Sequence, residues 1–234
     1  MAGKKLPKLY IIHGWTYRPE PWHEVIEELK KIDVDAELLK VPGLGTKSDK
    51  VFTIEDYAKW AREKLPKGGY ALGHSNGGRI LLNMLEKDPD YLKGVILLDA
   101  AGVWEKENRR KTLKAISKVL SPLKKVKIVR KAAHRLIGAN DYENAPENMK
   151  KTLDNMINSD KTLDMTKVTT RAEIIWGEDD QTTPLRQGKK MHELLPNSEL
   201  TTKPGWRHSH YLVSTSELAA EIKKELTKLA EPKK

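Results

Sequence analysis

Residues 70–80 decide the fold of this chain, and they read Tyr70-Ala-Leu-Gly73-His74-Ser75-Asn76-Gly77-Gly78-Arg79-Ile80. The stretch fits the pattern Gly-x-Ser-x-Gly, which places a serine on a sharp turn between a strand and a helix. The residues two before and two after the serine crowd each other, so they must be small, and Gly73 and Gly77 meet that need. The apolar run at 70–73 favours a strand before the turn, and 77–87 favours a helix after it. Such a turn exposes the Ser75 hydroxyl above the sheet and directs the N-terminus of the helix at it.

The same alternation of short apolar runs and amphipathic segments extends along most of the chain. Strands are expected at residues 9–12, 36–41, 70–73, 94–98, 172–176 and 199–203. Helices are expected at residues 22–31, 54–65, 77–87, 184–195 and 216–229, with Thr53 as the cap of the second. This order is typical of an α/β protein with a mostly parallel, twisted sheet and helices on both faces. In such sheets, chemistry gathers at the carboxyl ends of the strands.

The alternation breaks between residues 103 and 166, where the sequence has helical patterns but no convincing strand. A chain of 234 residues suits one α/β domain with a small insertion. We therefore expect a core domain formed by residues 1–102 and 167–234. Residues 103–166 are expected to form a helical cap inserted at the carboxyl edge of the sheet.

The composition excludes several classes of site and partner. The chain has no cysteine, which rules out disulfides and cysteine-ligated metals and fits a reducing, cytoplasmic compartment. No apolar run is long enough for a signal peptide or a membrane span. The net charge is +10, and residues 106–135 carry twelve Lys or Arg against one Glu. Without a nucleic-acid motif or interleaved aromatic residues, this charge indicates solubility, with attraction of anionic substrates as the functional alternative.

A second segment suited to chemistry follows the first expected strand. Residues 9–12 are apolar and continue into His13-Gly14-Trp15. Attack of a serine on a carbonyl builds negative charge on oxygen, and two backbone N–H groups must be aimed at that oxygen. We expect these donors to be the N–H groups of Trp15 and Asn76, with Gly14 leaving room for the backbone to turn. His13 is interpreted as a buried residue that holds the loop, and the Trp15 indole either lines the pocket or caps the core.

Acidic residues follow the fifth expected strand, where Glu178, Asp179 and Asp180 stand just before Thr182-Thr183-Pro184. A carboxylate at this place can reach a histidine on the next loop. All three residues are candidates, and a solvated acidic turn before a helix explains at least two of them. Asp99, at the end of the fourth strand, is a rival from the other side of the site.

A general base must come from the loop after the last strand, if the chain has one. That loop carries both His208 and His210, and a neutral imidazole of either residue suits proton transfer near pH 7. The remaining candidates, His23, His134 and His192, lie on probable helices and are expected to serve in packing or at the surface. The chemistry alone leaves His208 and His210 open.

Together these motifs resemble the α/β-hydrolase superfamily. The matching pieces are His13-Gly14, Pro42-Gly43-Leu44-Gly45, Gly73-His-Ser75-Asn-Gly77-Gly78, Leu97-Leu98-Asp99, Trp176-Gly177-x-x-Asp180 with Pro184, and the loop at His208. In that family the acid is the third residue after the glycine of Trp-Gly, which selects Asp180. The alignment of the histidine loop selects His208 and places His210 where the family usually has proline. The chain departs from the family at Trp206-Arg207, where glycine usually precedes the histidine, and at Asn76, where an apolar residue is usual.

The resemblance implies a capped serine hydrolase of the carboxylesterase type. Ser75 would be the nucleophile, His208 the general base and Asp180 the acid that orients it, with no metal or cofactor. Gly14, His74 and Trp104 are expected to contribute to the substrate site. A small carboxylic ester is the expected substrate and partner, and the protein is expected to be a monomer or homodimer. The alternatives are hydrolysis of a carbon–carbon bond next to a ketone, or a receptor with slow turnover on the same fold.

Overall fold

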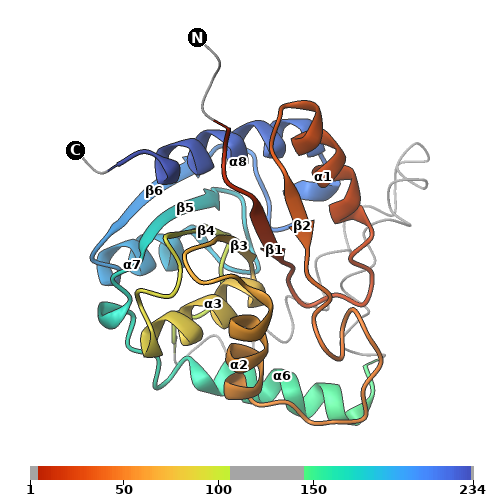
Figure 1. Cartoon of the computed structure of the whole chain (residues 1–234). Helices are drawn as coiled ribbons and strands as arrows, with labels where there is room; N and C mark the ends of the chain where they lie inside the picture. Colours follow the sequence, from red (N-terminus) through yellow and green to blue (C-terminus); the bar gives the residue numbers. More distant parts are fainter. Residues whose placement is uncertain (1–4, 106–144, 233–234) are drawn as a thin grey trace.

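A six-stranded sheet forms the centre of the molecule in the computed structural model (Figure 1). The structure describes residues 5–105 and 145–232. The strands are β1 (Leu9–Ile12), β2 (Ala36–Leu38), β3 (Tyr70–His74), β4 (Gly94–Leu98), β5 (Arg171–Gly177) and β6 (Ser198–Lys203). Their order is β2-β1-β3-β4-β5-β6, and every neighbouring pair is parallel. The predicted α/β class is therefore confirmed, with a sheet that is wholly rather than mostly parallel.

Helices cover both faces of this sheet, as the alternation predicts (Figure 1). The helices are α1 (Pro21–Lys31), α2 (Ile54–Lys64), α3 (Asn76–Lys87), α6 (Glu147–Ser159), α7 (Leu185–Leu194) and α8 (Thr215–Ala230). Helices α1 and α8 pack together on one face, whereas α2, α3 and α7 contribute to the apolar cluster on the other. Helix α6 packs beside α2. The structure thus has three layers, helix, sheet and helix.

The apolar core consists of two clusters, one on each side of the sheet. Along β4, Val95 and Leu97 face the cluster shared with α2 and α3, and Ile96 and Leu98 face the cluster shared with α1 and α8. All four side chains are buried. A strand covered on both faces is apolar throughout, because its side chains alternate between two dry environments. Each such side chain contributes about 1.5–3 kcal/mol through burial.

The second strand is shorter than expected, because β2 ends at Leu38 and not near residue 41. Among the described strands β2 pairs with β1 alone, and β1 ends at Ile12. One further bond runs from the N–H of Leu39 to the carbonyl of Ile11, at 2.9 Å. After this bond the two strands no longer pair, because β1 has ended at Ile12.

Helix α2 begins as predicted, at the Thr53 cap. The Asp56 N–H donates to the Thr53 hydroxyl at 3.2 Å, and the Thr53 N–H donates to the Asp56 carboxylate at 2.9 Å. This reciprocal capping box satisfies two backbone donors that a helix start leaves unpaired.

The expected cap falls largely outside the described residues. Residues 106–144, which include His134, are not described, and α6 with a 3₁₀ turn at Met165–Lys167 represents the remainder. The cap boundaries at 103 and 166 therefore stay a prediction. Within the described ranges, no helix is long and apolar enough to span a membrane.

Candidate active site

The turn between β3 and α3 holds Ser75 in a conformation that few non-glycine residues adopt. Its φ is 51° and its ψ is −118°, which carries the backbone into a strained region. A Cβ added to Gly73 would lie 2.6 Å from the backbone of Gly78, and one added to Gly77 would lie 2.0 Å from the Ile12 carbonyl oxygen. The predicted need for small residues is confirmed, although Gly77 is crowded by the end of β1 and not by Gly73 alone.

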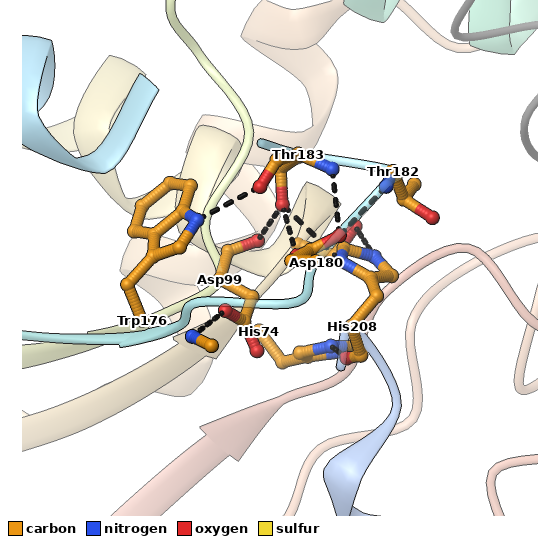
Figure 2. A network of polar contacts seen from close by, with 9 residues as sticks. His74, Asp99, Trp176, Asp180, Thr182, Thr183 and His208 are labelled. Atoms are coloured by element: carbon orange, nitrogen blue, oxygen red, sulfur yellow. Dashed lines mark hydrogen bonds and ion pairs between the residues drawn. The ribbon is translucent and has the colours of Figure 1, made fainter. Parts of the chain in front are cut away.

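Three predicted residues from three separate loops meet at this turn. His208 Nε2 lies 3.0 Å from Ser75 Oγ. His208 Nδ1 lies 2.7 Å from Asp180 Oδ2, and Figure 2 shows these two residues side by side. An ionised carboxylate only accepts hydrogen bonds, so Asp180 fixes the proton on Nδ1. The lone pair on Nε2 therefore faces the Ser75 hydroxyl, which can donate its proton to the ring.

Asp180 is buried at the end of the β5–α7 connection and is surrounded by donors. The N–H groups of Thr182 and Thr183 donate to its Oδ1 at 2.7 and 3.0 Å, and the Thr183 hydroxyl lies 2.7 Å from its Oδ2. Burial alone would raise the pKa of Asp180, but the charge and hydrogen bond of His208 and the bonds from Thr183 outweigh it, so the pKa is lowered. Asp180 therefore stays ionised beside the histidine.

The rival acids occupy other positions. Glu178 and Asp179 are exposed, and neither has a hydrogen bond to His208 among the described residues. Asp99 is fully buried, accepts a 2.8 Å hydrogen bond from the Gly177 N–H through Oδ1, and has no partner for Oδ2 in the described part of the chain. Burial, followed by the charge of Asp180, raises the pKa of Asp99 well above its ordinary value.

His208 and His210 lie in the same loop after β6 but have different contacts. The His210 ring stacks on Trp206 with centroids 3.8 Å apart, and its Nε2 lies 3.2 Å from Glu217. Trp206, which stands two residues before the histidine, is therefore part of the loop packing. Burial lowers the pKa of His208. The charge and hydrogen bond of Asp180 raise it by more than burial lowers it, so the pKa lies above the ordinary value of 6.5.

His74 has a different position from the expected substrate contact. Its side chain is buried, its Nε2 lies 2.8 Å from the carbonyl oxygen of His208, and its ring packs against Trp22 and Tyr211. Burial, followed by the charge of His208, lowers the pKa of His74 to about 3. The neutral His74 ring donates a hydrogen bond from Nε2 to the carbonyl oxygen of His208. This geometry favours support of the His208 loop over contact with substrate.

The loop after β1 lies against the same turn. A Cβ added to Gly14 would be 3.0 Å from both the Ser75 Cβ and the His74 ring. The N–H groups of Trp15 and Asn76 have no hydrogen-bond acceptor in the described ranges. His13 is buried with its Nδ1 2.8 Å from the Gly14 carbonyl, and burial lowers the pKa of this ring. This placement agrees with the interpretation of His13 as a residue that holds the loop.

A cavity of about 390 Å³, including its open mouth, reaches Thr183, which contacts Asp180 and His208, and includes Trp104 in its wall. The other lining residues are Arg79, Ala101, Gly102, Val103, Glu105, Ile157, Asp160, Thr182, Thr183 and Gln187. Among residues 5–105 and 145–232, no group of three or more His, Asp or Glu side chains could hold a metal ion.

Sequence reasoning missed two sets of contacts around the triad. One is the support of His208 by His74, and the other is a buried network of Arg79, Asp160 and Asn76. Arg79 and Asp160 stand 81 positions apart, and only the packing of α6 near α3 brings them together. The one signal in the sequence is a charged residue, Arg79, at the start of the apolar run of this helix.

Comparisons with known proteins relate this chain to a family and to several relatives. A family model described as the alpha/beta hydrolase fold matches residues 7–174. The pimeloyl-(acyl-carrier protein) methyl ester esterase of Yersinia pseudotuberculosis serotype O:1b (strain IP 31758) is 27% identical over 94 residues, which cover 40% of this chain and 36% of that relative. The enzyme of the same name from Vibrio vulnificus (strain CMCP6) is 25% identical over 104 residues, covering 44% and 40%. The chain therefore aligns with less than half the length of either curated relative.

Solved structures share the fold over nearly the whole chain. A thermophilic esterase from Thermogutta terrifontis has a TM-score of 0.70 at 19% identity, covering 96% of this chain and 91% of its own. A monoacylglycerol lipase from Paleococcus ferrophilus has a TM-score of 0.66 at 17% identity, covering 95% of each chain. The family model extends from before β1 into β5 and includes the Ser75 turn, and on this match the chain belongs to the alpha/beta hydrolase fold family.

Proposed function

We propose that this protein is a serine hydrolase that cleaves small carboxylic esters. The observation that carries the proposal is the continuous chain of contacts from Ser75 Oγ to His208 Nε2, at 3.0 Å, and from His208 Nδ1 to Asp180 Oδ2, at 2.7 Å. The strained turn that presents Ser75 supports it, because such strain persists where it serves a site.

In the proposed mechanism, Ser75 Oγ attacks the ester carbonyl while His208 Nε2 takes the hydroxyl proton. The resulting imidazolium is stabilised by the ionised Asp180, which itself stays unprotonated. His208 then donates the proton to the departing alkoxide, leaving an acyl group on Ser75. A water molecule activated by His208 attacks this acyl-enzyme, and the carboxylic acid is released.

The charge that develops on the carbonyl oxygen needs donors in place before the reaction. We propose the N–H groups of Trp15 and Asn76, because Asn76 follows Ser75, Trp15 follows Gly14, which lies against the Ser75 turn, and neither N–H has an acceptor within the described residues. Gly14 allows this approach, since any side chain there would collide with the Ser75 Cβ. Loss of one such donor costs on the order of 3 kcal/mol of transition-state stabilisation.

The substrate class rests on the relatives and on the cavity. The names of the curated relatives specify a methyl ester as the bond cleaved. The described residues leave a small, partly open cavity next to Thr183, with Trp104 in its wall. We therefore propose a short acyl chain, with Trp104 as one wall of its site.

Hydrolysis of p-nitrophenyl esters from acetate to decanoate tests this function, with dimethyl pimelate as a methyl ester and Ser75→Ala as the matched variant. We expect turnover that is greatest for short chains and falls on the order of 10⁶-fold in the variant, as for loss of a serine nucleophile elsewhere. Equal rates for both proteins with every ester would refute the esterase. Carbon–carbon bond hydrolysis and a slow-turnover receptor would then be tested in its place.

A further inference from the structure

A buried ion pair lies one helical turn from the nucleophile. Arg79 is on α3, and its Nε and Nη2 donate to the two carboxylate oxygens of Asp160 at 2.7 and 2.8 Å. The side chains are only 5% and 6% exposed. Removing two charges from water is costly, and well-packed apolar residues in their place are often as stable. Stability alone therefore gives a weak reason for this pair.

The third arm of the guanidinium explains the arrangement better. Arg79 Nη1 donates a hydrogen bond to the side-chain oxygen of Asn76, the residue directly after Ser75. Arginine has donors and no acceptor, so the amide oxygen of Asn76 must face Arg79. The amide nitrogen must then point the other way. Asp160 holds the guanidinium in the plane that this contact requires, through a bidentate pair.

Among the residues that the structure describes, the amide nitrogen of Asn76 has no hydrogen-bond partner. This nitrogen, Nδ2, is not one of their fully buried, unpartnered polar atoms. Asn76 as a whole is only 5% exposed, so this unpartnered amide nitrogen belongs to a residue that is almost entirely buried. Asn76 directly follows Ser75 at the start of α3, so two donor hydrogens belong to the residue next to the one that would carry the acyl group.

We propose that Asn76 determines specificity by donating a hydrogen bond from Nδ2 to an acceptor atom of the substrate next to the scissile carbonyl. Arg79 and Asp160 are its positioning residues. The inference rests on the esterase function proposed above and deepens it, because it assigns the substrate class as esters with a hydrogen-bond acceptor in the short acyl chain. Without Arg79, the Asn76 amide can flip or bond to nearby backbone, as asparagine does at helix starts.

Two esters of the same length provide the probe. p-Nitrophenyl methoxyacetate and p-nitrophenyl butyrate differ by an ether oxygen in place of one methylene group. The quantity compared is the ratio of their kcat/KM values, divided by the ratio of their rates with hydroxide to remove intrinsic reactivity. A loss common to both esters cancels in this corrected ratio.

Asn76→Asp tests the donor directly. The variant keeps an oxygen for Arg79, replaces the donor nitrogen with an acceptor oxygen and adds a negative charge, whose effect common to both esters cancels in the corrected ratio. We expect the corrected ratio to fall about fivefold, in line with loss of one hydrogen bond to a neutral group. An unchanged ratio in this variant would overturn the role of Nδ2.

The double variant Arg79→Met/Asp160→Leu tests the positioning, with thermal melting to confirm that it folds. It should lose the same preference although Asn76 is intact, and adding Asn76→Ala should change the ratio no further, because residues that act through one contact are not additive. A retained ratio in the folded double variant would overturn the role of Arg79 and Asp160. If it does not fold, Arg79→Lys decides the point in the same way, because a lysine ammonium cannot engage both Asp160 and Asn76 with a planar fork.

The matched control is the pair Arg62–Asp88, which also joins an arginine to an aspartate but sits at the far end of α3. Arg62→Gln/Asp88→Asn should leave the corrected ratio unchanged, and a fivefold fall there would attribute the effect to general loosening of the helix. Absence of turnover by the wild type with both esters would refute the esterase function and this inference with it. A wild type that turns over both esters with a corrected ratio near one would refute the inference alone.

Discussion

Two buried aspartates lie near His208, and their surroundings separate their pKa values. Burial raises the pKa of both, but Asp180 gains two backbone donors, a hydroxyl and the imidazole, so its pKa is lowered. Asp99 has a single N–H donor, and the charge of Asp180 raises its pKa further. When the surroundings of two carboxyl groups shift their pKa values in opposite directions, the group with the lowered pKa is the one that acts in its charged form. The pKa of Asp99, the rival acid in the sequence, is thus shifted in the opposite direction to that of Asp180.

Substitution of each aspartate by asparagine should have very different effects. Asp180→Asn should lower kcat on the order of 10⁴-fold, because the imidazole loses both its tautomer and its stabilising charge. Asp99→Asn should change kcat by less than about tenfold, because the raised pKa of Asp99 favours the neutral acid, which an amide resembles. Steady-state ester hydrolysis measures both values. Equal losses in the two variants would mean that Asp99 shares the role given to Asp180.

The state of His208 sets the pH dependence. Its imidazole must be neutral to accept the Ser75 proton, so kcat/KM should rise as His208 loses its own proton. The folded pKa is raised above 6.5 by Asp180 against the opposing effect of burial, which places the midpoint of the rise above pH 6.5. Initial rates between pH 5 and 9 give the profile. A flat profile, or a midpoint below 6.5, would contradict the assignment of His208.

At the scale of elements, several glutamates lie close together between β5, β6 and α8, where little solvent reaches them. Glu173 on β5 is 1% exposed and lies near Glu199 of β6 and Glu225 of α8, while Lys228 is 3.8 Å away. Burial, followed by the charge of Glu199, raises the pKa of Glu173 to about 7. Its own-strand neighbour Arg171 lies 3.6 Å away and offsets little of this effect.

This raised pKa makes the fold sensitive to pH in a defined direction. The folded protein binds the Glu173 proton more tightly than the unfolded chain, so the stability it contributes is lost as pH rises from about 4.5 through about 7. Glu173→Gln mimics the protonated form and should raise the melting temperature at pH 8 by about 2–4 °C, for roughly 1 kcal/mol in a chain of this size. The gain should vanish near pH 4.5. A lower melting temperature for the variant at pH 8 would show that Glu173 acts as a needed partner of Lys228.

At the scale of the whole molecule, sequence reasoning reached the features that depend on short-range pattern. The turn at Ser75, the parallel sheet and the Thr53 cap all follow from residues close together in the chain. The motifs around Ser75, Asp180 and His208 predicted a triad, and the side chains of these three residues do contact one another. The contacts of His74 with the His208 loop and of Arg79 with Asp160 span 134 and 81 positions. They depend on how loops and helices pack after the sheet has formed, and no local pattern encodes that.

The net charge of +10 is a property of the whole chain, and its effect on function can be separated from that of the site. A positive protein attracts an anionic substrate over a distance set by salt, with a Debye length near 30 Å at 0.01 M and below 8 Å above 0.15 M. We expect kcat/KM for p-nitrophenyl hydrogen glutarate, which carries a carboxylate, to fall at least about threefold between 0.01 and 0.5 M NaCl. Its neutral methyl ester has nearly the same shape and should show little change over the same range.

The difference between these two esters isolates the charge. An equal response of both would mean that salt acts on the enzyme and not on the encounter, so the basic surface would serve solubility alone. A fall confined to the anionic ester would instead show that positive charge assists its capture. Residues 106–135, which carry twelve of the Lys and Arg residues, are then the segment to neutralise, and Lys-to-Gln substitutions there should reduce the salt dependence while the neutral ester reports an unaltered Ser75 site.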